Sequence, residues 1–392
     1  MKIALVAQLP TDGDRIRLRE LSRALTDAGH RVTADIGAGG ELDHLDDEAG
    51  DRALLAQVPE FAGRLVTRWR RARPDVVHAA GWTSGLAALS AARELDVPVV
   101  QSFGPLAAAR QRHGLRPPGL AAERIRLEAA IGRSAAAVLA GSSAQAVNLT
   151  RLGVSRRAVT IVPCGVDTTA FTPRATEATS RSTPSVSPGT LAAAKGGQSR
   201  RLVMVTPLAD HVGTAIRALP RLPGMELVIA GGPGKEVLGG DDDYLTLTAL
   251  AKAEGVDDRV TFAGYVDRAA LPNLLRSADL LVSTSTFEPT GMAVLEAMAC
   301  GLPVVACATG GALPDIIIDG TTGLLLPPGR PAVLADRIRR LFGHPMLLSG
   351  MRVAAADRAR SRYSWARVAA ETLAVYEQVT GYASAEPAEA AA

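Results

Sequence analysis

One stretch in the second half of the chain indicates a parallel α/β fold: Leu280-Leu-Val-Ser-Thr-Ser-Thr-Phe-Glu-Pro-Thr-Gly-Met-Ala-Val-Leu-Glu296. Its first part, up to Phe287, is apolar and β-branched and ends in polar residues, which is typical of a buried parallel strand that leads into a loop. Thr290 can act as an N-cap, and we expect a helix from Gly291 to Cys300. Glu288 is therefore predicted just past the carboxyl end of a strand.

This stretch also favours a particular kind of ligand. A helix amino terminus attracts an anion such as a diphosphate, and Gly291 allows the ligand to approach the backbone closely. Glu288 precedes the helix and Glu296 lies about two turns further along the chain. Carboxylates accept hydrogen bonds from vicinal hydroxyls, so the layout suits an anion between two polyols. A nucleotide sugar has this shape.

Strands and helices alternate through most of the chain. Apolar runs at Lys2–Ala7, Val76–Ala79 and Val97–Gln101 alternate with helical stretches, and the alternation resumes at Arg201 after a segment rich in Ser, Thr, Pro, Ala and Gly. Such alternation predicts doubly wound parallel sheets with sites at the carboxyl ends of the strands. We expect an α/β protein with two Rossmann-like domains that face each other across a cleft.

The spacing of the two carboxylates resembles the Glu-x7-Glu signature of the large retaining glycosyltransferase family 4, whose members have the two-domain GT-B fold. Other motifs follow that family in order and spacing over nearly the whole chain. They are Leu21-x3-Leu25-x3-Gly29-His30-x-Val32, Asp75-Val-Val-His78, Val162-Pro-Cys-Gly165-Val-Asp167, Val228-Ile-Ala-Gly231-Gly-Pro233, Val260-x-Phe262-x-Gly264, Arg276-Ser-Ala-Asp279, Gly310-Gly311 and Asp319-Gly320-x-x-Gly323. Each motif is weak alone, but the ordered set is specific.

Five segments follow from the pattern and the resemblance. We expect an amino-terminal acceptor-binding domain at 1–173, a flexible linker or loop at 174–200 and a nucleotide-sugar-binding domain at 201–364. A last helix at 365–382 is expected to pack back on the first domain, and 383–392 is expected to be a disordered tail.

The resemblance implies roles for the residues of the signature. Glu288 would bind hydroxyls of the donor sugar and act in catalysis, and Glu296 would bind the ribose hydroxyls. Gly291 and Met292 would offer backbone amides to the sugar and diphosphate. Further donor-side candidates are Thr290, Gly13 and Gly231.

The chain departs from the family where a Gly-Arg-Leu-x4-Lys-Gly stretch would neutralise the diphosphate. Here the sequence has Val205-Thr-Pro-Leu-Ala-Asp-His-Val-Gly213, so both cations are missing. Their loss would remove several kcal/mol of transition-state stabilisation unless other groups replace them. His211 is the nearest substitute and a catalytic candidate, although a plain loop histidine explains it equally well. Arg201 or Lys235 would serve only if folding brings them close.

Acceptor-side candidates lie in the first half of the chain. His78 ends the Asp-Val-Val-His motif, and Arg110 and Arg112 belong to a basic loop that would bind an acidic acceptor or become ordered when substrates arrive. Two histidines usual in the family are replaced by Ala80 and Gly104. The resemblance leaves an envelope lipid, a polysaccharide and a small natural product as acceptor candidates.

A basic segment from Arg64 to Arg73 has two interpretations. It could form an amphipathic helix that lies on an anionic membrane, as a peripheral contact, or a solvated helix face. We favour the solvated face, because arginines often extend into water from a helix whose other side is buried.

Composition limits the function classes. With 392 residues, 47% of them hydrophobic, the chain can form two full cores, and a net charge of +3 is too small to indicate nucleic-acid binding. Three cysteines without metal spacing suggest core thiols in a reducing cytoplasm and no zinc or disulfide framework. The reaction that the resemblance implies requires no metal or other cofactor. The first ten residues are typical of a β-strand and not of a signal peptide. Abundant arginine and alanine suggest a bacterial genome of high GC content.

These observations lead to a hypothesis and an alternative. The protein is expected to be a retaining glycosyltransferase that moves a hexose from a nucleotide-diphosphate sugar to an acceptor hydroxyl. The alternative is a degenerate family member that binds a sugar nucleotide, or acts as a partner subunit, without catalysing transfer. An enzyme of the same fold that cleaves or epimerises a sugar phosphate is a third hypothesis. The sequence does not indicate the donor base, the hexose or an oligomeric state.

Overall fold

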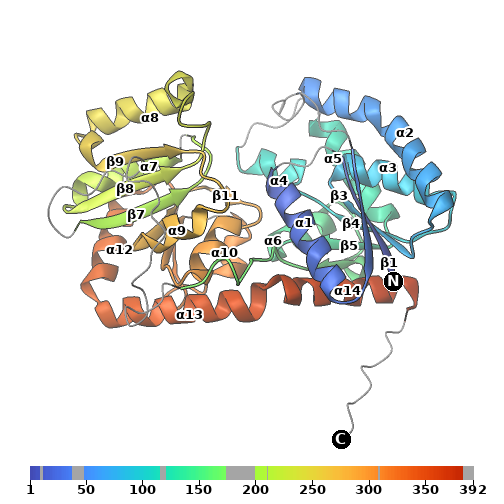
Figure 1. Ribbon diagram of the computed structural model, residues 1–392. Helices are drawn as coiled ribbons and strands as arrows, with labels where there is room; N and C mark the ends of the chain where they lie inside the picture. Colours follow the sequence, from blue (N-terminus) through green and yellow to red (C-terminus); the bar gives the residue numbers. More distant parts are fainter. Residues whose placement is uncertain are drawn as a thin grey trace, which may run out of the picture. The chain divides into compact units, whose positions relative to one another are not determined.

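The computed structural model divides the chain into two compact units (Figure 1). The first unit contains Met1–Gly165 and Trp365–Ala392, and the second contains Val166–Ser364. The structure describes residues 1–8, 12–37, 48–114, 121–173, 199–209, 211–307 and 310–382. The predicted tail, and the predicted linker up to residue 198, lie outside these ranges.

The first unit is built on a six-stranded parallel sheet. The strands stand in the order β2 (Arg31–Ile36), β1 (Lys2–Ala7), β3 (Val76–Ala80), β4 (Val99–Ser102), β5 (Ala137–Ala140) and β6 (Val159–Ile161). The helices are α1 (Asp12–Asp27), α2 (Glu48–Arg71), α3 (Trp82–Arg93), α4 (Ala107–Arg112), α5 (Ala121–Ser134), α6 (Ser143–Arg151) and α14 (Trp365–Thr380). One apolar cluster joins the sheet to α2 and α3, and another joins it to α1 and α14. Both faces of the sheet are thus covered, as continuous apolar strands require.

The second unit repeats this architecture. Its parallel sheet has the order β14 (Leu324–Leu326), β12 (Val304–Cys307), β10 (Leu280–Ser283), β7 (Arg200–Val205), β8 (Met225–Ala230) and β9 (Val260–Gly264). The helices are α7 (Val212–Ala218), α8 (Asp242–Ala253), α9 (Leu271–Arg276), α10 (Met292–Ala299), α11 (Leu313–Ile316), α12 (Pro331–Gly343) and α13 (Pro345–Tyr363). The short strands β11 (Phe287–Glu288) and β13 (Gly310–Gly311) pair with each other.

The order of the strands locates the site in the second unit. The chain runs outward from β7 through β8 to β9 and then returns to β10 on the other side of β7. In open α/β sheets, ligands bind outside the carboxyl ends of the strands at this reversal. The segment that contains Glu288 leaves the carboxyl end of β10, next to the switch point.

Residues 166–173 group with the second unit. The backbone N–H of Val166 donates to the carbonyl of Tyr363 at 2.7 Å, and Phe171 is 1% exposed. This short segment therefore contributes to the core of the second unit before the chain reaches β7.

Candidate functional site

Glu288 is held by backbone pairing on the strand that it ends. Phe287 pairs with Gly310 and Glu288 with Gly311, and the N–H of Ala312 donates to the carbonyl of Glu288 at 2.7 Å. The pairing of β11 with β13 fixes the backbone of a residue that would otherwise lie in an open loop.

The Glu288 carboxylate is folded back onto the turn that follows it. Its Oε1 accepts a hydrogen bond from the N–H of Gly291 at 3.2 Å, and the backbone N–H and hydroxyl of Thr290 also donate to the carboxylate. Burial raises the pKa of Glu288, and these donors oppose the rise. The side chain is half-buried, so it can contact a ligand while three donors hold it in place.

The start of α10 differs from the expected one. Thr290 is not the N-cap: the helix begins at Met292, and the capping residue is Gly291, in the left-handed conformation with φ 67°. The hydroxyl of Thr290 donates to Glu288 and is not used to cap the helix. Apart from Met292 and Ala293, which are half-buried, the residues of α10 are buried.

Three glycines in this unit stand where an added Cβ atom would lie very close to a neighbouring atom. A Cβ atom on Gly291 would lie 2.3 Å from Ile316 Cδ1, and one on Gly311 would lie 2.0 Å from the carbonyl oxygen of Glu288. At Gly231, with φ 143°, a Cβ atom would lie 1.9 Å from the carbonyl oxygen of Thr206. Gly231 therefore places the loop after β8 directly against the loop after β7.

Glu296 has a charged partner that its sequence context does not reveal. The guanidinium of Arg268, from the loop between β9 and α9, donates a hydrogen bond from Nη1 to Glu296 Oε1. Burial raises the pKa of Glu296 to about 6, although Arg268 opposes the rise. The two residues are 28 positions apart in different elements, so no local spacing in the sequence points to the pair.

His211 links the loops that follow β7 and β10. Its Nε2 lies 2.9 Å from the hydroxyl of Thr206, and its carbonyl accepts a hydrogen bond from the hydroxyl of Thr284 at 2.8 Å. The residue precedes α7, at the same end of the sheet as Glu288. Its neighbour Asp210 lies outside the described residues.

Arg201 and Lys235 are the two other cations expected as substitutes for the missing basic pair. Arg201 lies at the amino-terminal end of the strands, away from Glu288. It stands near the start of β7, pairs with Glu226 at 2.6 Å and donates to the hydroxyl of Ser277. Lys235 is exposed in the loop after β8, at the end of the sheet where the switch point lies. Among the described residues, the basic side chain that pairs with a carboxylate of the Glu-x7-Glu segment is Arg268.

His78, expected on the acceptor side, is engaged within the first unit. The hydroxyl of Tyr376 on α14 lies 2.6 Å from its Nδ1, and the hydroxyl of Ser102 lies 2.9 Å from its Nε2. Burial, together with the charge of Arg17, lowers the pKa of His78 to about 3. The ring is neutral at physiological pH, and contact with an acceptor would require it to give up one of these partners.

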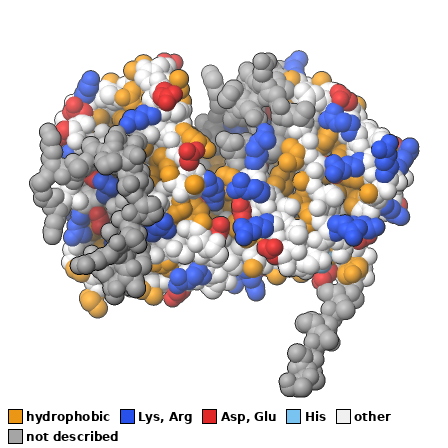
Figure 2. Space-filling view, in the orientation of Figure 1, with side chains coloured by type: hydrophobic (Ala, Val, Ile, Leu, Met, Phe, Trp, Pro, Cys, Tyr) orange, Lys and Arg blue, Asp and Glu red, His pale blue; other side chains and the backbone are white. Residues whose placement is uncertain are grey.

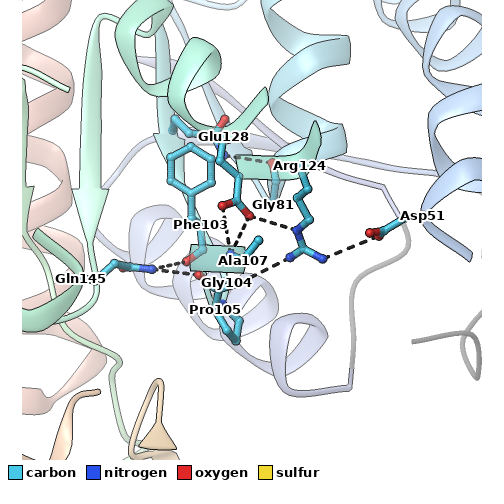
Figure 3. Close-up of polar contacts among 10 residues, drawn as sticks. Asp51, Gly81, Phe103, Gly104, Pro105, Ala107, Arg124, Glu128 and Gln145 are labelled. Atoms are coloured by element: carbon cyan, nitrogen blue, oxygen red, sulfur yellow. Dashed lines mark hydrogen bonds and ion pairs between the residues drawn. The ribbon is translucent and has the colours of Figure 1, made fainter. Parts of the chain in front are cut away.

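A buried ionic network shapes the turn between β4 and α4 (Figure 3). Glu128, 1% exposed, accepts from the N–H of Ala107 at 3.0 Å and from Nε of Arg124 at 3.0 Å. Arg124 also donates to the carbonyl of Pro105 and approaches Asp51 at 3.6 Å. The carboxylate of Glu128 thus accepts from an N–H group in the first turn of α4, where the N–H groups of a helix have no partner within the helix.

The two arginines expected on the acceptor side were predicted in a loop, but they lie in the last turn of α4. Arg112 is exposed, and its Nη2 donates to Asn148 Oδ1 at 2.5 Å, whereas Arg110 is half-buried. On the other side of the turn, Gln145 donates to the carbonyls of Phe103 and Gly104 (Figure 3). The turn is therefore formed without the histidine that the family usually has at position 104.

Gly13, a donor-side candidate expected in a loop, lies in the first turn of α1. The neighbouring Asp14 carboxylate lies 3.4 Å from the guanidinium of Arg17. A contact between Gly13 and the donor remains a prediction.

Comparison with known proteins identifies the family. Residues 202–362 match the family described as Glycosyl transferases group 1, and residues 12–170 match Glycosyltransferase Family 4. The D-inositol 3-phosphate glycosyltransferase of Pseudarthrobacter chlorophenolicus is 32% identical over 388 residues, which covers 93% of this chain and 90% of that protein. The chain belongs to the group 1 glycosyltransferases of family 4. It is therefore a glycosyltransferase, and the expectation from the resemblance is confirmed.

Other relatives agree with this assignment. The D-inositol 3-phosphate glycosyltransferase of Mycolicibacterium smegmatis is 33% identical over 323 residues, covering 81% of this chain and 70% of that protein. Because these relatives are named as transferases, they do not favour the alternative of a degenerate, non-catalytic member.

Solved structures of this kind confirm the GT-B fold. Sucrose-phosphate synthase from Thermosynechococcus elongatus superposes with a TM-score of 0.78 at 22% identity, covering 97% of this chain and 99% of that one. Anabaena Alr3699/HepE in complex with UDP-glucose superposes with a TM-score of 0.73 at 20% identity, covering 97% and 100%. The prediction of two doubly wound α/β domains is thus confirmed.

Helix α2 of this glycosyltransferase packs large apolar side chains against the first unit. Phe61, Leu65 and Trp69 are buried in the core of the first unit. Arg68 pairs with the buried Asp35 at 2.7 Å, and other arginines of the helix pair with Glu60 and Glu94. Figure 2 shows basic side chains along the edge of the molecule where Figure 1 places α2. The arrangement favours the solvated face over the amphipathic membrane helix.

Two further observations bear on the environment of the protein. Within the described part of the chain, every helix is too short or too polar to span a lipid bilayer. The same residues contain no group of three or more His, Cys, Asp or Glu side chains that could hold a metal ion. A bacterial source, a cytoplasmic location and a peripheral membrane contact remain predictions.

The contact between His78 and α14 leads to a first prediction. Tyr376→Phe should lower the free energy of unfolding of the first unit by about 1 to 3 kcal/mol, because it leaves a buried ring nitrogen without its partner. Chemical denaturation followed by circular dichroism measures the change. Tyr382→Phe is the matched control, since Tyr382 is 48% exposed, and it should change stability by no more than about 0.5 kcal/mol. Equal stabilities of the two variants would contradict the prediction.

Proposed function

We propose that this glycosyltransferase moves a hexose from a nucleotide-diphosphate sugar to an acceptor hydroxyl with retention of the anomeric configuration. The observation that carries the proposal is the pair of carboxylates on either side of the start of α10, next to the switch point of the second sheet. Glu288 is held by the turn at Thr290 and Gly291, and Glu296 by Arg268. Each carboxylate keeps a defined orientation for hydroxyl groups of a donor.

The start of α10 is suited to the diphosphate between them. A helix amino terminus has unpaired N–H groups and a partial positive charge that favours an anion. Gly291, which is buried, adopts the left-handed conformation here, and the half-buried Met292 is the first helical residue. The amide of Met292 would donate to the sugar and diphosphate, and the amide of Gly291 would do so in exchange for its bond to Glu288, with Gly231 allowing close approach from the loop after β8.

The reaction would proceed on one face of the sugar. As the bond to the diphosphate breaks, positive charge develops at the anomeric carbon, and the Glu288 carboxylate would stabilise it and position the sugar hydroxyls. The departing phosphate oxygen would take the proton of the acceptor hydroxyl as that hydroxyl attacks from the same side. His211 would add a hydrogen-bond donor to the leaving group in place of the missing basic pair, and no metal ion is required in this scheme.

The acceptor is proposed to be an anionic polyol. Two observations support this class: the relatives named above are D-inositol 3-phosphate glycosyltransferases, and Arg110 and Arg112 form a basic end of α4 in the first unit. Arginine binds phosphate through a planar array of N–H donors, which makes a phosphorylated polyol a better match than a neutral sugar.

Donor turnover with a panel of candidate acceptors tests the proposal. The protein is incubated with UDP-, GDP-, dTDP- and ADP-hexoses, with and without inositol phosphates, and products are followed by proton NMR. We expect one base to be preferred, a transfer product only with a phosphorylated acceptor, and the anomeric configuration of the donor in that product. An inverted product would contradict retention, and transfer to neutral inositol alone would contradict the acceptor class.

A further inference from the structure

Glu296 depends on one cation for its charge. The side chain is 2% exposed, and among the described residues Arg268 is its hydrogen-bond partner and its counter-ion. An ionised carboxylate removed from water is strongly unfavourable unless it is paired. The pairing occupies Oε1, so Oε2 is the atom available to a ligand.

Arg268 is itself held by a second contact. Its guanidinium carbon lies 5.1 Å from the centroid of the Phe171 ring, and the arginine side chain is 26% exposed. Phe171 comes from the segment before β7, Arg268 from the loop after β9, and Glu296 from α10. Three separate parts of the second unit thus converge on this ion pair, which limits the orientations that Arg268 can adopt.

We propose that Arg268 is a positioning residue of the donor site, which keeps Glu296 ionised and directs its free oxygen toward the paired hydroxyls of the donor nucleotide. The inference rests on the proposed function, because it assigns those hydroxyls to Glu296. An ionised carboxylate accepts hydrogen bonds that are roughly twice as strong as those between neutral groups. Loss of the charge would therefore weaken nucleotide binding even if the side chain stayed in place.

The sign of the pH dependence follows from the burial of Glu296. Its pKa is about 6 with Arg268 present, so the carboxylate is mostly ionised above that pH. Arg268 opposes the effect of burial, and its removal should raise the pKa further. A larger fraction of Glu296 would then be protonated at any given pH.

Other groups around α10 do not replace Arg268. On the helix side, burial raises the pKa of Cys300 to about 12, and on β12 burial raises that of Cys307 to about 11, so both thiols are neutral. The charge of Arg276 opposes the rise in the pKa of Cys300. Arg358 of the adjacent α13 donates to the backbone carbonyls of Ile316 and Asp315. The carbonyl oxygen of Arg352, also on α13, lies 3.9 Å from the position that a Cβ atom on Gly301 would take.

Nucleotide affinity across pH tests the proposal. Isothermal titration with the preferred nucleoside diphosphate is carried out from pH 5 to pH 9 on the wild type, Arg268→Ala, Arg268→Lys, Glu296→Gln and the double variant Arg268→Ala/Glu296→Gln. Wild-type affinity should fall below about pH 6. In Arg268→Ala the fall should move to higher pH, with a loss of about tenfold for each unit by which the pKa exceeds the assay pH. Arg268→Lys should restore most of the wild-type profile.

Three results separate positioning from other roles. Glu296→Gln should bind weakly with no pH dependence in this range, and the double variant should match it, because Arg268 acts through Glu296. A double variant weaker than Glu296→Gln would mean that Arg268 contacts the nucleotide directly, and this would overturn the proposal. Arg340→Ala is the matched control: it also removes an arginine–carboxylate pair, to Asp336 at 2.9 Å, and should leave the profile unchanged.

A measurement without ligand distinguishes failure of this inference from failure of the proposed function. Between the unfolded and folded pKa values of Glu296, the folded state binds more protons, so its contribution to stability should fall as pH rises from about 4.5 to about 6. The difference in melting temperature between the wild type and Glu296→Gln should decrease over this pH range. The difference between Arg268→Ala and the double variant should continue to decrease at higher pH. Identical pH profiles in the two comparisons would overturn the inference, whatever the nucleotide data. Absence of nucleotide binding by the wild type would refute the proposed function and, with it, the donor role of Arg268.

Discussion

Gly311→Ala should abolish binding of the donor sugar at Glu288 and lower the free energy of unfolding of the second unit by about 3 kcal/mol. Gly311 has φ 86°, which is unfavourable for any residue with a Cβ atom. The added atom would also lie 2.0 Å from the carbonyl oxygen and 2.6 Å from the carbonyl carbon of Glu288. Because both neighbours are backbone, the strand β11 must move, and the carboxylate of Glu288 would move with it.

Gly320→Ala provides the control for this prediction. Gly320 has φ 75°, but no atom lies within 4 Å of the position that its Cβ would take. The substitution should therefore cost only the left-handed backbone term, about 1 kcal/mol, and should leave nucleotide binding unchanged. Thermal unfolding with and without a nucleotide-diphosphate sugar measures both effects. The same melting temperature and the same nucleotide response in the two variants would contradict the role of Gly311.

Glu288→Gln should lower kcat about 10²- to 10³-fold while the protein remains folded. Glutamine has nearly the same size and can still accept from the N–H of Gly291. It carries no negative charge to stabilise the positive charge that develops on the sugar, and its amide cannot accept from all the donors of Thr290. The loss should therefore appear mainly in the chemical step.

The kinetic signature separates the two carboxylates. Initial rates over a range of donor concentrations should show a large fall in kcat for Glu288→Gln and mainly a rise in the donor KM for Glu296→Gln, since Glu296 binds a part of the donor that does not react. Circular dichroism and melting curves verify that both variants are folded. A kcat for Glu288→Gln within a few-fold of the wild type would show that this carboxylate is not needed for transfer.

Elements marked by local sequence signals were predictable. The apolar run from Leu280 became β10, and the predicted helix from Gly291 to Cys300 became α10 at Met292–Ala299. Strand and helix periodicity, together with Gly at a helix boundary, act over a few residues, so one sequence is enough to detect them.

Contacts between distant parts of the chain were not predictable in this way. The Arg268–Glu296 pair and the packing of Gly311 against Glu288 depend on tertiary structure. The residue type of Thr290 predicts an N-cap, but its hydroxyl has a stronger acceptor within reach in the half-buried carboxylate of Glu288. The family motif predicts a functional role for His78. Its hydrogen bond with Tyr376 connects two residues 298 positions apart, so no local pattern predicts that contact.

We propose that the second unit binds a nucleotide-diphosphate sugar between Glu288 and Glu296. The most direct test is the change in melting temperature with UDP, GDP, dTDP, ADP and their hexose conjugates, for the wild type, Glu296→Ala and the surface control Asp336→Ala. A ligand at about a hundredfold its Kd stabilises the native state by about 3 kcal/mol, which is a shift of several degrees. We expect one base to stabilise the wild type and Asp336→Ala equally and to have little effect on Glu296→Ala. No shift with any nucleotide at millimolar concentration, or an equal shift in Glu296→Ala, would contradict the assignment of the donor site.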